Sequence, residues 1–334
     1  MQWRMYVPGE LLPLMTLTIS NISKSFGNFH AIRDVSFEVT DGRIFGFLGT
    51  NGAGKTTTMR MILDIIRQDS GTITWNGTPV SELPRRRFGY LPEERGLYPK
   101  MQVEDQLVFL AQLSGAQKST VLQELDEWLN RLDITENRHR TIEQLSKGNQ
   151  QKIQFLAAIL HDPDILVLDE PFSGLDPVNT EQMKQAFLAM RDRGKTVIFS
   201  THQLDQAQEL CEDVAIIHRG QVVANGDVDD VRRSTGKQHV RFTVAGDNRV
   251  TWLDDLPQVQ VVRRREDYIE LAVPDDEIAR SILTAAVERG APVERFEISA
   301  PSLNDVFLSV VRKLPEHDDR IDTPAQPQRT PVVV

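Results

Sequence analysis

An eight-residue stretch, GTNGAGKT at 49–56, fits the pattern G-x-x-x-x-G-K-[ST] between a strand-like run and a helix-like run. In such a loop, backbone N–H groups surround a phosphate, the lysine adds charge beside the β- and γ-phosphates, and the final hydroxyl binds Mg²⁺. A chance glycine-rich turn is the alternative, which the flanking runs disfavour. The predicted phosphate-binding residues are Gly49, Thr50, Asn51, Gly52, Ala53, Gly54, Lys55, Thr56 and Thr57.

Two adjacent carboxylates, Asp169 and Glu170, end the apolar run ILVLDEP at 165–171. Asp169 is placed to reach Mg²⁺, and Glu170 to orient or deprotonate an attacking water. Two acids at a buried strand end are unfavourable without a cation or a water partner. The alternative is an ordinary helix-capping pair after a strand.

A histidine, His202, follows the apolar run TVIFST. Ligands of parallel sheets gather at the carboxyl ends of the strands, so His202 is predicted to hydrogen-bond a γ-phosphate. A purely structural histidine is the alternative.

The stretch LSKGNQQ at 145–151 predicts a helix start that is weak on its own terms. Ser146 suits an N-cap, but Lys147 is disfavoured by the helix dipole, and Gly148 costs about 1 kcal/mol relative to alanine. Either this is a poor exposed cap, or an anion that is not part of the chain binds there.

These motifs together resemble the ATP-binding-cassette (ABC) ATPase family over about residues 16–230. LSKGNQQ is similar to the family signature LSGGQ, with Lys147 and Asn149 departing from it. The phosphate loop, the signature, the two carboxylates, SGLD at 173–176 and the histidine follow in the family's order. The resemblance implies ATP and Mg²⁺ as cofactors and ATP hydrolysis as the activity.

The resemblance also implies roles that the residues alone do not. Phe26 matches the aromatic that stacks on adenine, with a strand-end core phenylalanine as the alternative. Ser146 and Gly148 would face the γ-phosphate held by a second chain, in a homodimer or a pair of ATPase subunits. Glu93, in YLPEERGLYP, stands where the family often has a metal-contacting glutamine. A carboxylate there also suits Mg²⁺, but it adds negative charge near the γ-phosphate.

The patterns that must position these residues predict an α/β fold, and the resemblance implies a P-loop core of ABC ATPase type. A helical subdomain at about 100–160 interrupts it, and a small C-terminal α+β domain follows. The predicted divisions are a loose extension at 1–14, the ATPase domain at 15–232, the α+β domain at 237–314 and a disordered tail at 315–334. The run LDQAQELCEDVAII predicts a helix that carries Cys211 as a buried core residue.

Composition narrows the class of protein. The chain has 334 residues, a net charge of −10 and one cysteine. The negative charge disfavours a nucleic-acid binder, and the arginine runs at 84–88 and 261–266 are predicted to be solvated faces or ion pairs. A lone cysteine fits a reducing compartment, and no apolar run is long enough for a membrane span.

The favoured function is the ATP-hydrolysing subunit of an ABC transporter that drives separate integral membrane permease subunits. YLPEERGLYP and APSLNDVFLSVV resemble exporter subunits of the sodium-efflux NatA type, which implies export. The expected location is cytoplasmic, peripheral on the inner face of the cell membrane. The loop from Glu93 to Pro99 and the helical subdomain are predicted to contact the permease. The alternatives are an ABC-type ATPase that acts on ribosomes or DNA, and a non-hydrolysing binding module.

Overall fold

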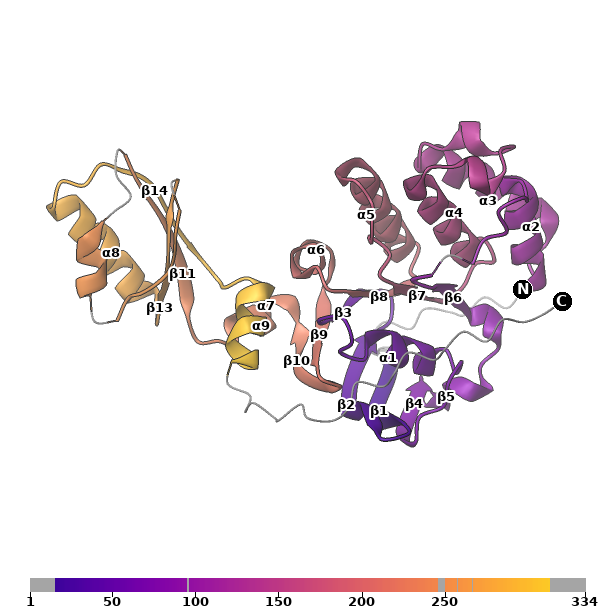
Figure 1. Ribbon diagram of the computed structural model, residues 1–334, viewed down its shortest axis with the longest axis horizontal. Helices are drawn as coiled ribbons and strands as arrows, with labels where there is room; N and C mark the ends of the chain where they lie inside the picture. Colours follow the sequence, from indigo (N-terminus) through magenta and orange to yellow (C-terminus); the bar gives the residue numbers. More distant parts are fainter. Residues whose placement is uncertain (1–15, 95, 246–249, 257, 266, 313–334) are drawn as a thin grey trace, which may run out of the picture.

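The computed structural model describes residues 16–94, 96–245, 250–256, 258–265 and 267–312 (Figure 1). The predicted extension at 1–14 and the predicted tail at 315–334 lie outside the described residues. Within the described ranges, no helix combines the length and the apolar character that crossing a bilayer requires.

A six-stranded sheet lies at the centre of the larger lobe. All of its strands are parallel except β10, which pairs antiparallel with β9. Its three central strands are buried at every residue, which explains their continuous apolar sequences. In spatial order the strands are β10 (Gln221–Asp227), β9 (Asp213–His218), β3 (Ile44–Leu48), β8 (Thr196–Thr201), β7 (Ile165–Asp169) and β6 (Phe88–Leu91).

A second, antiparallel sheet packs beneath it, with helix α1 (Lys55–Ile62) between the two (Figure 1). Phe37 joins the layers by stacking on Phe45 and Phe47, with ring centroids 5.3 and 5.2 Å away. Asn76 and Gly77 form the turn between the last two strands of this sheet, and both have positive φ. The strands of this sheet are β2 (Phe29–Thr40), β1 (Thr16–Phe26), β4 (Ser70–Trp75) and β5 (Thr78–Pro79).

Helices cover the other face of the six-stranded sheet (Figure 1). Trp128, Phe155, Phe187 and Phe199 form a chain of ring contacts that ties three of these helices to β8. The predicted helical insertion is confirmed as α2 (Val103–Leu113), α3 (Lys118–Arg131) and α4 (Lys147–Ile159); α5 (Pro177–Asp192), α6 (Leu204–Leu210) and α7 (Val228–Arg233) follow. Single 3-10 turns lie at Val80–Glu82, Arg85–Arg87, Thr135–Asn137, Ile142–Gln144 and Thr251–Asp255.

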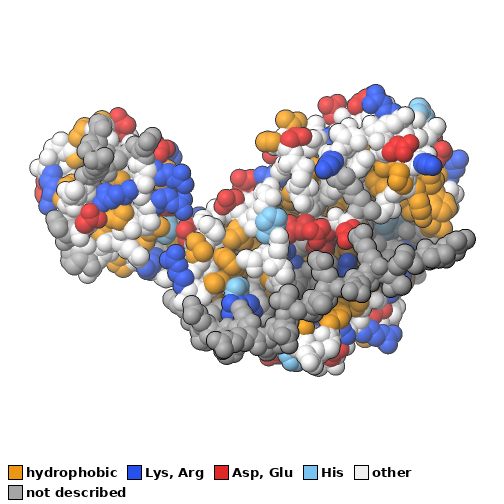
Figure 2. All heavy atoms as spheres, viewed as in Figure 1, with side chains coloured by type: hydrophobic (Ala, Val, Ile, Leu, Met, Phe, Trp, Pro, Cys, Tyr) orange, Lys and Arg blue, Asp and Glu red, His pale blue; other side chains and the backbone are white. Residues whose placement is uncertain are grey.

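The C-terminal residues form a separate lobe, visible in Figure 2. Helix α8 (Asp276–Glu288) packs on one face of an antiparallel sheet, whereas α9 (Leu303–Val311) contacts α6 and α7 of the larger lobe. Two bonds fix α9 there: Leu303 N donates to Gln208 Oε1 at 2.9 Å, and Arg232 Nε donates to Pro301 O at 2.9 Å. The sheet order is β12 (Gln260–Arg264), β13 (Ile269–Val273), β11 (Gln238–Val244) and β14 (Val293–Ser299).

One predicted helix is wrong in its second half. Helix α6 ends at Leu210, Cys211 has extended backbone, and Asp213–His218 form β9. The apolar residues 214–217 pair with the buried strand β3, and this strand pairing overrides the helical pattern of the sequence. Of the arginines at 261–266, Arg263 and Arg264 lie on the edge strand β12, where Arg264 pairs with Asp254 at 2.8 Å.

Candidate functional site

The glycine-rich loop joins β3 to α1 and packs tightly against its neighbours. A Cβ on Gly49 would lie 2.3 Å from Ile217 O. Gly54 has φ of 107°, and a Cβ there would lie 2.9 Å from Ala31 O. These two positions therefore require glycine. Helix α1 begins directly after Gly54 with no side-chain cap, so the loop places uncapped backbone N–H groups at one point.

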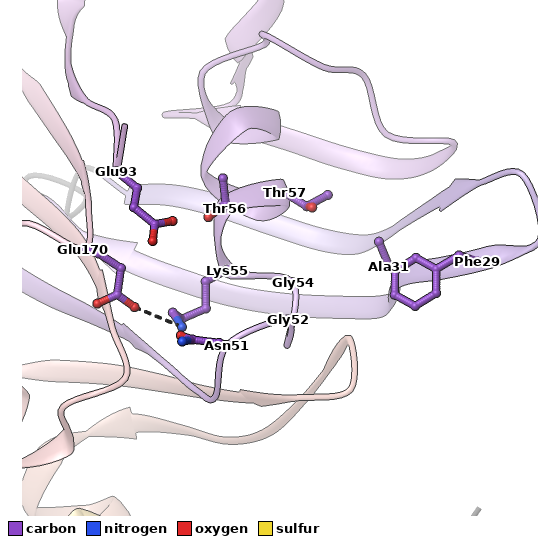
Figure 3. Close-up of a pocket in the computed structure, with 10 residues that line it drawn as sticks. All are labelled: Phe29, Ala31, Asn51, Gly52, Gly54, Lys55, Thr56, Thr57, Glu93 and Glu170. Atoms are coloured by element: carbon purple, nitrogen blue, oxygen red, sulfur yellow. Dashed lines mark ion pairs between the residues drawn. The ribbon is translucent and has the colours of Figure 1, made fainter. Parts of the chain in front are cut away.

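The ammonium of Lys55 is buried at the foot of this loop. Its Nζ donates to Gly49 O at 2.8 Å and to Thr50 O at 3.3 Å. It also lies 3.1 Å from Glu170 Oε1, and both side chains are 6% exposed (Figure 3). The geometry thus joins the phosphate loop to the carboxylates at the end of β7, which lie more than a hundred residues away in sequence.

Glu170 holds an unusual backbone conformation just beyond β7. Its φ is 48°, in the left-handed region that costs a non-glycine residue about 1–2 kcal/mol. Its N–H donates to Ser200 Oγ at 3.0 Å and to Ser200 O at 3.2 Å, which fixes this conformation. Its second carboxylate oxygen, Oε2, lies 3.0 Å from His202 Nδ1. Left-handed backbone at a charged, buried residue is typical of functional sites.

Asp169 is fully buried, and only one of its oxygens has a partner among the described residues. Oδ1 accepts a hydrogen bond from Ser200 Oγ, whereas Oδ2 has none. A buried carboxylate oxygen without a donor is costly unless a cation or a water binds it. This orphaned oxygen fits the Mg²⁺ role predicted for Asp169. Thr56 and Glu93, the other predicted Mg²⁺ ligands, line the cavity above the glycine-rich loop, and Asp169 is not among its lining residues.

A cavity of about 420 Å³ opens above the loop. Glu93 and Thr56 lie on the same side of it, and Glu170 points toward Lys55 (Figure 3). The aromatic that lines this cavity is Phe29, not Phe26, although Phe26 pairs with Phe29 across a two-residue turn. Both rings are about half exposed, and Lys24 Nζ lies 5.7 Å from the Phe26 ring. Among the described residues, the lining consists of Phe29, Ala31, Asn51, Gly52, Gly54, Lys55, Thr56, Thr57, Glu93 and Glu170.

The signature stretch begins α4, as its sequence predicts. Ser146 is the N-cap and accepts a hydrogen bond from Asn149 N at 3.2 Å. Gly148 is buried, and a Cβ there would lie 2.7 Å from Asn179 Nδ2. These contacts are with the end of a flexible side chain that can move aside, so packing alone does not require glycine here. Neither Ser146 nor Gly148 lines the cavity of its own chain, and their contact with nucleotide stays a prediction.

Helix α4 also holds the two loops that carry the carboxylates. Gln151 Nε2 donates to Pro171 O at 3.1 Å, next to Glu170. Gln154 Nε2 donates to Pro92 O at 2.9 Å, next to Glu93. The helix that begins with the signature is thus bonded directly to both sides of the site.

Sequence reasoning missed Phe29 and Ser200, and also Gln151 and Gln154 of α4. The Gly27-Asn28 turn is a signal that Phe26 and Phe29 lie opposite each other, but it does not say which ring reaches the cavity. No local pattern marks Ser200, because its role depends on β8 lying beside β7.

Comparisons with known proteins agree with this geometry. Residues 32–173 match the family described as ABC transporter, and residues 226–311 match the family of the ATP-binding protein DrrA1-3-like C-terminal domain. A solved structure of an ATP binding subunit of an ABC transporter is 31% identical, with a TM-score of 0.61 over 66% of this chain and 93% of its own.

Three relatives, all from Bacillus subtilis (strain 168), extend the match. An uncharacterized ABC transporter ATP-binding protein, YhaQ, is 42% identical over 88% of this chain and 98% of its own length. The ABC transporter ATP-binding protein NatA is 31% identical over 68% of this chain and 95% of its length. The linearmycin resistance ATP-binding protein LnrL is 29% identical over 88% of this chain and 97% of its length.

Proposed function

Because the chain belongs to the family of ABC transporter ATP-binding proteins, which bind and hydrolyse ATP to serve transport, we propose that it pairs with a second ATPase subunit and drives separate permease chains. One observation carries the catalytic part of this proposal. The Glu170 carboxylate lies between Lys55 Nζ, at 3.1 Å, and His202 Nδ1, at 3.0 Å.

Each residue then has a defined role in phosphoryl transfer to water. Lys55 and the N–H groups of the loop bind the phosphates, and Lys55 exchanges its carbonyl partners and Glu170 for phosphate oxygens. Glu170, once released, orients the attacking water and accepts its proton, while His202 holds the second carboxylate oxygen. Asp169, Thr56 and Glu93 would hold Mg²⁺, which would neutralise charge at the phosphates when bound.

Hydrolysis by purified variants tests these roles. Glu170→Gln keeps the shape of the side chain but loses the base, so turnover is expected to fall roughly 10²–10⁴-fold with ATP binding intact. Lys55→Ala is expected to lose nearly all turnover because the buried charge beside the phosphates is removed. Glu297→Gln, on the C-terminal lobe, is the matched control. Near-normal turnover of Glu170→Gln contradicts the assignment.

Pairing of two chains is supported by the position of the signature, which lies outside the cavity of its own chain. ATP closes such a pair because the γ-phosphate offers charge to both halves, and hydrolysis reopens it. Size-exclusion chromatography of Glu170→Gln with ATP is expected to yield a dimer that ADP does not support. A monomer in both nucleotides refutes the pairing.

The permease surface is proposed on α2 and the loop before it. Tyr98, Phe109 and Leu113 are 53%, 44% and 69% exposed, and the last two share one face of α2. Figure 2 shows hydrophobic side chains gathered on this lobe. Leu113→Ser is expected to weaken co-purification with a co-expressed permease, whereas Val287→Ser, equally exposed on α8, is not. Recovery of the chain with ribosomes or DNA instead favours the alternative function.

Export is the proposed direction. The match to LnrL spans both lobes, and its name assigns it to resistance. Uptake of a labelled compound into inverted vesicles that carry the permease and this chain tests the direction. ATP-dependent accumulation inside those vesicles supports export, and ATP-dependent loss contradicts it.

A further inference from the structure

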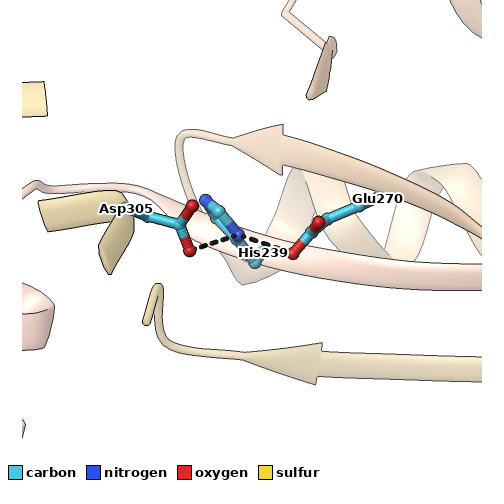
Figure 4. A group of neighbouring side chains, drawn as sticks. All are labelled: His239, Glu270 and Asp305. Atoms are coloured by element: carbon cyan, nitrogen blue, oxygen red, sulfur yellow. Dashed lines mark hydrogen bonds and ion pairs between the residues drawn. The ribbon is translucent and has the colours of Figure 1, made fainter. Parts of the chain in front are cut away.

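A histidine and two carboxylates converge in the C-terminal lobe, far along the chain from the nucleotide cavity. His239 lies on β11, Glu270 on β13 and Asp305 in the first turn of α9 (Figure 4). One ligand atom from each lies within 4.8 Å of the other two. The three side chains are only 10%, 15% and 20% exposed.

The contact between His239 and Glu270 is a long hydrogen bond, and both separations from His239 also fit a shared cation. Nδ1 of His239 lies 3.4 Å from Glu270 Oε1 and 3.7 Å from Asp305 Oδ2. Ligand atoms about 2.0–2.2 Å from a tetrahedral Zn²⁺ lie about 3.3–3.6 Å from one another. Hydrogen bonds of these groups are shorter, near 2.7–3.2 Å.

A divalent cation would balance the charge of the two carboxylates. Two carboxylates beside one imidazole carry negative charge in a poorly solvated place. The strand register sets Arg241 and Arg263 opposite Glu270, but among the described residues neither forms an ion pair with it. The Arg241 guanidinium lies instead over the Tyr268 ring, 4.8 Å from its centroid.

Hydrogen bonds from Ser302 hold the Asp305 carboxylate in place. Oδ2 of Asp305 accepts a hydrogen bond from Ser302 N at 3.0 Å and another from Ser302 Oγ, in the capping box of α9. Hydrogen bonds of this kind hold metal-binding carboxylates in place.

We propose that His239, Glu270 and Asp305 form a site for a divalent transition metal of the Zn²⁺ type, with one nitrogen and two oxygen ligands. Imidazole and carboxylate together suit this class of ion, and a water completes the tetrahedron. The metal clips the C-terminal sheet to α9, the helix that is bonded to α6 of the larger lobe. This site is independent of the proposed transport function.

Equilibrium dialysis of the full chain against Zn²⁺ alone, without nucleotide, tests the site. His239→Gln is expected to weaken binding of one equivalent by at least about 100-fold, the upper end of the effect of losing an outer partner. His139→Gln, at an exposed histidine after α3, is the matched control. Glu270→Gln and Glu297→Gln form a second matched pair.

Co²⁺ supplies a readout that a purely structural role does not move. Bound in this site, Co²⁺ is expected to show the intense visible absorption of four-coordinate geometry, lost in His239→Gln and kept in His139→Gln. The unfolding midpoint of each variant, measured without metal, identifies any variant that fails to fold. If His239→Gln does not fold, Glu270→Gln is used in its place. The proposal is overturned if the wild-type chain does not bind Zn²⁺, or if His239→Gln and Glu270→Gln both bind it as tightly as the wild-type chain. ATP hydrolysis enters none of these measurements.

Discussion

Replacing Ser200 with alanine is expected to destabilise the chain while leaving its shape unchanged. Ser200 is fully buried, and its Oγ both donates to Asp169 Oδ1 and accepts from Glu170 N at 3.0 Å. Oδ2 of Asp169 already lacks a partner among the described residues. Ser200→Ala therefore leaves a fully buried carboxylate with neither oxygen hydrogen-bonded, while Glu170 N keeps its longer bond to Ser200 O.

The magnitude follows from the groups left behind. An unsatisfied buried polar group costs about 1–3 kcal/mol, and more when it is charged, so a loss of about 2–3 kcal/mol is expected. For a domain of this size each kcal/mol lowers the melting temperature by about 2–4 °C, which gives a shift of about 4–12 °C. Magnesium binding at Asp169 would offset part of this loss.

Differential scanning calorimetry with and without Mg²⁺ and ATP measures both effects. Ser173→Ala, an exposed serine in the loop after Glu170, is the matched control and is expected to change stability by less than about 0.5 kcal/mol. If Ser200→Ala is as stable as the wild type, the inference that the Asp169 carboxylate needs the Ser200 hydrogen bond is refuted. A deficit that Mg²⁺ and ATP leave unchanged refutes the link between Asp169 and the metal.

Two further outcomes follow from the same structure. Phe29→Ala is expected to weaken ATP binding roughly 5- to 160-fold, since a stacked base contributes about 1–3 kcal/mol, whereas Phe26→Ala is expected to leave it near wild type. Fluorescence titration with a nucleotide analogue decides, and the reverse order would support Phe26 as the stacking residue. Burial raises the pKa of the Cys211 thiol well above its usual range, so a thiol reagent at pH 8 is expected to label the native chain far more slowly than the chain in denaturant. Because the folded state disfavours the thiolate, the raised thiol pKa contributes to the stability of the folded chain. This contribution is full below the ordinary thiol pKa and is lost as the pH rises through the raised value. Equal labelling rates of the native and the denatured chain would contradict the burial of this thiol.

Much of the site follows from the sequence because its parts are local. The spacing in GTNGAGKT, the apolar run before Asp169 and Glu170, and the N-cap at Ser146 each depend on neighbours a few residues away. Alternation and helical periodicity predict the strands and helices around them for the same reason. The same patterns predict a small C-terminal α+β domain, whereas they do not predict the strand at Asp213–His218, since its pairing overrides its local pattern.

Which side chains meet was decided by the order of the strands in the sheet, which is not their order in the chain. Strand β8 lies between β3 and β7, so Ser200 bonds both carboxylate residues and His202 reaches Glu170. His239 likewise meets Glu270 because β11 pairs with β13, and Asp305 joins them from α9. Local sequence determines what each residue can do, but contacts between distant residues are set by packing of the whole chain, and only the tertiary structure contains them.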